Sequence, residues 1–195
     1  MTQTIFSKLR TLKIGLSLAC LLFAATAWSQ VTPGSGDVSF NLGYDHFSSL
    51  NGFAWGGAGE TALTQYVDLG AELNDYRVSQ SVSGVTGALH LIDYGALGRF
   101  NLVPNSKVVP YGLFAFGGSH ASVSASSGGI SASASAGNGY YLGFGGGASI
   151  YLSPSWGVRA ELRDNWNHIS GSGLNAFAMT GGVFYQFGGH SGRKK

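Results

Sequence analysis

The sequence predicts an all-β protein, an eight-stranded antiparallel up-and-down transmembrane β-barrel preceded by a signal peptide. Eight segments between residues 37 and 187 alternate apolar with polar residues, which is the period of a strand with two different faces. Only 10% of the 195 residues are charged, whereas an ordinary soluble domain has about 25%. Short turns also alternate with longer polar connections, as they do in barrels that cross a bacterial membrane.

Residues 1–29 are expected to be a secretory signal peptide. Three basic residues precede an apolar run over 14–25, and Ala25-Thr26-Ala27 supplies the small residues of a cleavage site. The run is shorter than the roughly 20 residues that a spanning helix needs. Cys20, the only cysteine, lies inside this segment, so we expect neither a disulfide nor thiolate chemistry in the mature protein. The basic residues are Lys8, Arg10 and Lys13.

The charge of the chain argues against nucleic acid as a partner. The formal net charge is +2, from 11 Lys and Arg and 9 Asp and Glu. Loss of the signal peptide removes three basic residues and leaves eight against nine. Three of the eight, Arg193, Lys194 and Lys195, belong to a tail beyond the last expected strand. The barrel region at 37–187 therefore has no basic patch.

Eight strands can be placed from the alternation. It is clearest at 156–166, where apolar residues alternate with Arg159, Glu161 and Arg163. The segment at 108–117 is apolar on both faces, so its pattern leaves open which side faces inward. The expected strands cover 37–47, 55–63, 67–74, 88–102, 108–117, 140–152, 156–166 and 177–187.

Short turns and long connections are expected to alternate between these strands. Longer polar loops are expected at 48–53, 77–86 and 168–175. The segment at 120–139 alternates serine with alanine or valine on both sides of Gly128-Gly129, which favours a hairpin. We expect this hairpin to project beyond the membrane with a frayed tip. The short turns are expected at Thr64-Gln65, Pro104-Asn105-Ser106 and Ser153-Pro154-Ser155.

Charged residues are expected to point into the barrel. A barrel that faces lipid carries its apolar residues outside, and eight strands enclose a space that side chains can just fill. Because buried charges must be paired, we predict an internal network of ion pairs and hydrogen bonds that plugs the barrel. The alternative is a narrow, gated channel lined by the same charges. The predicted network residues are Asp45, Glu60, Glu72, Asp93, Arg99, Arg159, Glu161 and Arg163.

Tryptophan and tyrosine lie mostly near the ends of the expected strands. This placement is typical of the aromatic girdles at the two membrane interfaces. Trp28, at the cleavage site, is the exception. The residues concerned are Tyr44, Trp55, Tyr66, Tyr76, Tyr140, Trp156, Trp166 and Tyr185.

The last strand carries a pattern that resembles a known assembly signal. Its residues Thr180, Gly182, Tyr185 and Phe187 have the spacing seen on the terminal strand of outer-membrane β-barrels. The second and sixth strands are glycine-rich, and Val109-Pro110-Tyr111 begins the fifth. Together these features make residues 37–187 resemble the OmpA-like outer-membrane β-barrel domain family.

The resemblance implies a place in the outer membrane of a Gram-negative bacterium. It also implies insertion by the barrel-assembly machinery and contact with outer-membrane lipid and lipopolysaccharide. The tail at 188–195 would then lie in the periplasm. The peptidoglycan-binding domain of full-length OmpA proteins does not follow, so we do not expect tethering to the cell wall.

The resemblance defines an architecture rather than a site, because the family shares a barrel and not an activity. We expect a monomer with a structural or surface-interaction role through its extracellular loops. One alternative is a small porin-like channel.

A second alternative is a lipid A-modifying enzyme. His168 and Ser170 resemble the catalytic pair of outer-membrane lipid A deacylases, in which histidine activates a serine nucleophile. Those enzymes also use a carboxylate later in the chain, but no Asp or Glu follows Asp164. Gly171 stands where that family has asparagine. We therefore expect no enzyme and no catalytic residue.

The histidines do not form a metal-binding motif. No pair has metal-ligand spacing on one short element, so we expect no metal site and no cofactor. The five histidines are His46, His90, His120, His168 and His190.

Overall fold

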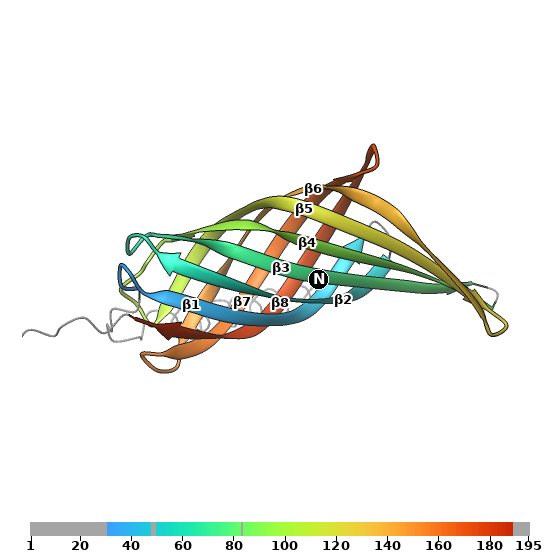
Figure 1. Cartoon of the computed structure of the whole chain (residues 1–195). Coiled ribbons are helices and arrows are strands. Elements are labelled where there is room, and N and C mark those ends of the chain that lie inside the picture. The colour runs from blue at the N-terminus through green and yellow to red at the C-terminus, as the bar shows by residue number, and fades with distance from the viewer. Residues whose placement is uncertain (1–30, 48–49, 83, 189–195) are drawn as a thin grey trace, which may run out of the picture.

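The computed structural model describes residues 31–47, 50–82 and 84–188. Eight antiparallel strands follow one another around a closed barrel in sequence order, and β1 closes it by pairing with β8 (Figure 1). The predicted fold is therefore confirmed. The strands are β1 (Gly36–Phe47), β2 (Leu50–Ala62), β3 (Val67–Val82), β4 (Val85–Asn101), β5 (Val108–Ser127), β6 (Ile130–Tyr151), β7 (Trp156–Ile169) and β8 (Ser172–Phe187).

Backbone pairing is continuous around the barrel. β1 and β8 lie opposite each other from Gly36 and Phe187 to Phe47 and Ala176. A bilayer demands this closure, because its hydrocarbon core offers no water to an unpaired N–H or C=O group. Among the described residues, no helix is long and apolar enough to cross a membrane. The predicted signal peptide and most of the predicted tail at 188–195 lie outside those residues.

The three predicted long loops are wrong, because most of their residues belong to strands. β3 and β4, for example, pair up to Val82 and Val85, which leaves a two-residue connection. Beyond the lipid both faces of a strand meet water, so polar residues continue the ladder and hydropathy no longer marks the strand's end. The ranges concerned are 48–53, 77–86 and 168–175.

The serine-rich hairpin is confirmed, and its predicted frayed tip is wrong. β5 and β6 pair up to Ser127 and Ile130, next to a turn at Gly128 and Gly129. Both glycines have positive φ, 58° and 85°, as a two-residue hairpin turn requires. The three predicted short turns join β2 to β3, β4 to β5 and β6 to β7.

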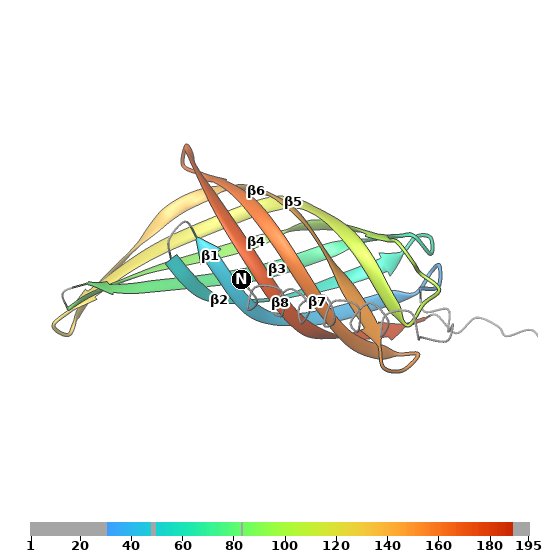
Figure 2. The same cartoon turned by 180° about the vertical axis from the view of Figure 1, so that it is seen from behind.

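Four strands, β3 to β6, extend further than the others at one end of the barrel. β5 and β6 contain 20 and 22 residues, whereas β1 contains 12. β2 pairs with β3 only as far as Val78, and β7 pairs with β6 only from Gly139. The remainder forms a four-stranded sheet that projects past the other strands (Figures 1 and 2). We call it the protruding sheet; it comprises residues 79–82, 85–88, 120–127 and 130–138.

The structure fixes the orientation of β5, which the pattern left open. Phe114 and Phe116 point outward, while Tyr111, Leu113 and Ala115 are buried inside the barrel. The inner face is apolar here because these side chains form a cluster with Leu97 and Tyr141. Apolar residues on both faces therefore reflect an apolar layer within the lumen.

Aromatic residues lie on the outer surface at both ends of the barrel. Trp156 lies opposite Tyr185 near the short turns, and Tyr44, Tyr140 and Trp166 are exposed near the other end. Tyr76 corrects the prediction, because it points into the barrel and only 2% of it is exposed. A residue near a strand end can point to either face of the barrel wall, and Tyr76 points to the inner face. Trp28 lies outside the described residues.

Candidate functional site

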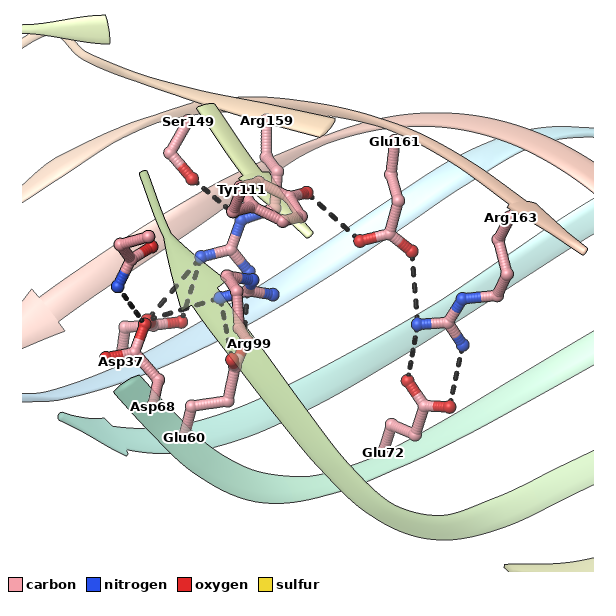
Figure 3. A network of polar contacts seen from close by, with 11 residues as sticks. Asp37, Glu60, Asp68, Glu72, Arg99, Tyr111, Ser149, Arg159, Glu161 and Arg163 are labelled. Atoms are coloured by element: carbon pink, nitrogen blue, oxygen red, sulfur yellow. Dashed lines mark hydrogen bonds and ion pairs between the residues drawn. The ribbon is translucent and has the colours of Figure 1, made fainter. Parts of the chain in front are cut away.

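The lumen nearest the short turns is filled by an arginine network. Two of its arginines converge on Glu60: Arg99 Nη1 lies 2.7 Å from Glu60 Oε2, and Arg159 Nη1 lies 3.4 Å from Glu60 Oε1 (Figure 3). Arg159 also reaches Asp37 at 3.4 Å and donates to Ser149 Oγ at 3.2 Å. Both guanidinium groups are buried, and a buried charge must be paired. The carboxylates that neutralise them come from β1 and β2.

Arg163 forms the second part of this network. It binds Glu72 through two parallel contacts, Nη1 to Oε1 at 2.6 Å and Nη2 to Oε2 at 2.7 Å. The bidentate geometry matches the planar guanidinium to the carboxylate. Nη2 also lies 3.1 Å from Glu161 Oε1 (Figure 3). Tyr141 and Tyr111 donate their hydroxyl groups to Glu72 and Glu161, at 2.9 and 3.0 Å.

Aromatic rings cover two of the arginines. Arg99 Cζ lies 4.5 Å from the centre of the Tyr111 ring, and Arg159 Cζ lies 5.0 Å from that of Phe184. The negative face of a ring attracts a desolvated cation. The arginine network, defined as Asp37, Glu60, Asp68, Glu72, Arg99, Arg159, Glu161 and Arg163, is therefore held by charges and rings from most of the barrel wall.

The lumen nearer the protruding sheet holds a different arrangement. Asp93 is fully buried and accepts hydrogen bonds from Asn167 at 2.7 Å, from Asn165 at 3.2 Å and from Ser119 Oγ. We call these four residues the acidic–amide cluster. Within the described part of the chain, no ion pair involves Asp93. Neutral donors take the place of arginine here.

Asp45 is buried beside an apolar plug. None of its surface is exposed, and neither carboxylate oxygen has a hydrogen-bond partner among the described residues. Phe47, Val78, Leu91 and Ile169 belong to the apolar cluster that fills this end of the barrel. The plug separates the charged lumen from the protruding sheet.

The structure places all eight predicted network residues inside the barrel. Six of them meet in the arginine network, whereas Asp45 and Asp93 do not. The prediction missed Asp37 and Asp68. Asp68 accepts a hydrogen bond from Asn101 Nδ2 at 2.8 Å. Both aspartates share the inward alternation of Asp45 and Glu72, so the sequence held a signal for them.

Two small cavities adjoin the arginine network. One cavity of about 20 Å³ is lined by Glu72, Arg99, Glu161 and Arg163, and another of about 10 Å³ lies beside Asp37 and Arg159. A single water molecule needs roughly 10 to 15 Å³.

The residues that resemble the assembly signal lie on both faces of β8. Tyr185 and Phe187 point outward and are about half exposed, whereas Thr180 and Gly182 lie on the inward face. A Cβ atom at position 182 would collide with the carbonyl oxygen of Phe40, so glycine permits the close approach of β1.

The candidate catalytic pair lies at the rim of the barrel. The His168 ring stacks on Tyr140, with 5.3 Å between centroids, and lies 6.0 Å from Trp166. Ser170 Oγ donates to the Ala136 carbonyl oxygen at 3.0 Å. Both side chains thus have other contacts. Among the described residues, no group of three or more His, Cys, Asp or Glu could hold a metal ion.

Comparison with known proteins agrees with this architecture. Neisserial surface protein A is 17% identical, with a TM-score of 0.59 and coverage of 83% of this chain and 99% of that one. Ail, the attachment invasion locus protein of Yersinia pestis, is 16% identical, with a TM-score of 0.50 and coverage of 80% and 99%. The N-terminal barrel of Pseudomonas aeruginosa OprF is 15% identical, also with a TM-score of 0.50 and coverage of 80% and 99%.

No match was found among curated protein sequences. The sequence model of one family, described as the outer membrane protein beta-barrel domain, matches residues 15–187. That range contains all eight strands of the closed barrel. The chain therefore belongs to the outer membrane protein β-barrel domain family and is a protein of the outer membrane.

Proposed function

We propose that this protein is a non-conducting outer-membrane barrel that contacts material outside the cell through its protruding sheet. One observation carries the proposal: β3 to β6 continue as a paired sheet beyond the ends of the other strands, although nothing in the barrel needs that length. Strands that serve only to span a bilayer need about 9 to 11 residues. β5 and β6, with 20 and 22 residues, have about twice that.

The filled lumen argues against the porin-like alternative. Arg163, Glu72 and Glu161 meet in the middle of the barrel at distances of 2.6 to 3.1 Å. An ion path would require these pairs to separate in a low-dielectric interior, which is costly. The barrel therefore serves as a rigid support for the sheet.

The geometry at the rim argues against the deacylase-like alternative. Ser170 Oγ donates a hydrogen bond to the Ala136 carbonyl oxygen, and the ring of His168 stacks on Tyr140. A serine nucleophile needs its hydroxyl directed at the histidine that activates it. We propose that these residues stabilise the rim and that the protein is not an enzyme.

The surroundings of the barrel follow from its outer face. Large apolar side chains such as Phe40, Leu73 and Phe144 are about half exposed and would contact the lipid chains. We propose outer-membrane lipid and lipopolysaccharide as neighbours, the barrel-assembly machinery as the inserting partner, and a monomer within one membrane. Ail supports a surface role by analogy, since its name describes attachment and invasion.

A hairpin-shortening variant tests the proposal. Removal of residues 122–127 and 130–135 would join Ala121 to Ala136 through the native Gly128-Gly129 turn and keep the pairing of β5 with β6 from Ala121 and Gly137 into the barrel. Cells that express either form are allowed to bind a surface coated with basement-membrane extract or with albumin. We expect the wild type to bind the extract and the shortened form to lose most of that binding.

The shortened form must still fold. Faster migration of the unboiled than of the boiled protein on a denaturing gel would establish that it does. Equal binding by both forms, with both barrels folded, would contradict a role for the protruding sheet.

A further inference from the structure

Among the described residues, both edges of the protruding sheet lack a neighbouring strand: residues 79–82 of β3 form the shorter edge and β6 forms the longer one. β7 pairs with β6 only from Gly139 onward, so residues 130–138 of β6 pair with β5 alone. The β7–β8 turn covers the lower end of this edge, where Ser170 Oγ donates to the Ala136 carbonyl oxygen. Six residues, 130–135, remain open, and alternate residues there direct their N–H and C=O groups away from β5.

The open edge lacks the usual protection against strand pairing. Natural edge strands are commonly blocked by lysine, proline or a bulge. Residues 121–139 contain no charged residue and no proline, and the one irregularity of the ladder lies below the open segment, near Ala121 and Ser122. An incoming strand would meet no charge and, beyond Ile130 beside the turn, only small side chains, because the open segment is Ile-Ser-Ala-Ser-Ala-Ser.

The sequence of this edge complements itself. In the β5–β6 ladder, Ser124 lies opposite Ser133 and Ser126 opposite Ser131, while Ala125 lies opposite Ala132. A second β6, antiparallel and centred on Ser133, would repeat this scheme: serine would face serine, and Ala132 would face Ala134. The chain already makes one hydroxyl pair of this kind, between Ser81 and Thr86 at 2.7 Å.

We propose that the open edge of β6 binds the same edge of a second copy of this protein in an opposing membrane. An antiparallel pair has a local twofold axis perpendicular to the sheet, so the axis reverses the direction of the strand. β6 runs from the tip of the protruding sheet into the barrel (Figure 1). The two barrels therefore extend in opposite directions from the paired tips, as they would on two facing cells.

Electrostatics favours a copy of the same chain over a charged partner. Identical surfaces repel each other wherever they carry net charge, and from residue 121 to residue 139 none is present. A charged peptide would gain nothing from this edge beyond backbone pairing. This inference rests on the proposed surface role and adds a partner for the open edge of β6.

A cysteine cross-link tests the pairing directly. Ser133→Cys would place one thiol opposite its own copy, whereas Ser124→Cys lies across the ladder on β5, one strand further from the edge. Each variant is reconstituted in two vesicle populations that carry different fluorophores on the protein, and the populations are mixed under mild oxidation. We expect disulfide-linked dimers that contain both fluorophores for Ser133→Cys and none for Ser124→Cys.

Vesicle tethering provides the matched functional readout. Wild-type vesicles should cluster with wild-type vesicles but not with empty ones, and Ser133→Pro should abolish clustering while the barrel still migrates faster unboiled. Proline at this position removes an N–H group that points away from β5.

The outcomes separate the partner from the proposed surface role. Absence of clustering by folded wild type, or cross-links confined to one vesicle population, would overturn homophilic pairing between membranes. Loss of binding to basement-membrane extract in the shortened form is measured independently. That result would keep the surface role even if the second copy were the wrong partner.

Discussion

The two parts of the lumen satisfy their buried carboxylates in different ways. In the arginine network, Arg163 holds Glu72 and Glu161 through charged contacts. In the acidic–amide cluster, Asp93 receives hydrogen bonds from Ser119, Asn165 and Asn167 and has no arginine partner among the described residues. Charge pairs fill the part nearer the short turns, and neutral donors with an apolar plug fill the part under the protruding sheet.

Loss of an arginine should have the largest effect. Arg163→Met would leave Glu72 and Glu161 buried without their cation, and removal of one partner of a buried pair costs about 3 to 5 kcal/mol. Urea unfolding of the protein in lipid vesicles, followed by tryptophan fluorescence, measures the free energy of unfolding. The triple variant Arg163→Met, Glu72→Gln, Glu161→Gln should recover part of the loss. If Arg163→Met were as stable as wild type, the arginine network would not stabilise the barrel.

Loss of the buried aspartate in the other part should cost less. Asp93→Ala would leave the donors of Ser119, Asn165 and Asn167 without their acceptor, at a cost of about 1 to 3 kcal/mol. Asp93→Asn, which keeps one acceptor oxygen, serves as the control and should lose less. The same urea titration measures the free energy of unfolding of both variants. A loss as large as that of Arg163→Met would mean that charged and neutral partners contribute equally here.

Neutralisation of Asp45 should have the smallest effect on the free energy of unfolding, and it should not destabilise the barrel. Asp45 has no ion-pair or hydrogen-bond partner among the described residues and lies beside an apolar cluster. Asp45→Asn keeps the shape of the side chain and removes the cost of burying a charge. We expect stability at pH 7 to be unchanged or higher by up to about 1 kcal/mol. A clear loss would reveal an attractive contact that involves the charge.

The sequence predicted the architecture and the inward charges, because a period of two separates lipid-facing from lumen-facing residues. Partners within the lumen could not be predicted, since Arg163 and Glu72 are 91 residues apart and meet only through strand register. The strand ends near the protruding sheet were wrong for another reason. Polar stretches such as 77–86 have no continuous apolar face, so they resemble loops although β3 and β4 pair there.

The inward side of Tyr76 and the orientation of β5 could not be predicted from the alternation of residues along a single strand. Tyr76 was assigned to the outer girdle, but its hydroxyl accepts a hydrogen bond from Asn165 inside the barrel at 2.7 Å. The β5 segment had apolar residues on both faces because the lumen contains an apolar layer around Tyr111 and Leu113. In both cases the side chain's position depends on residues of other strands across the lumen, and the pattern along one strand does not contain that information.

Conductance in a planar bilayer tests most directly whether the arginine network closes the barrel. Wild-type protein that has passed the gel-shift test for folding is inserted at neutral pH, and current is recorded at both polarities. We expect no stepwise conductance, because Arg163, Glu72 and Glu161 are joined across the lumen at 3.1 Å or less. Reproducible single-channel steps from the folded wild type would contradict it and favour the porin-like alternative.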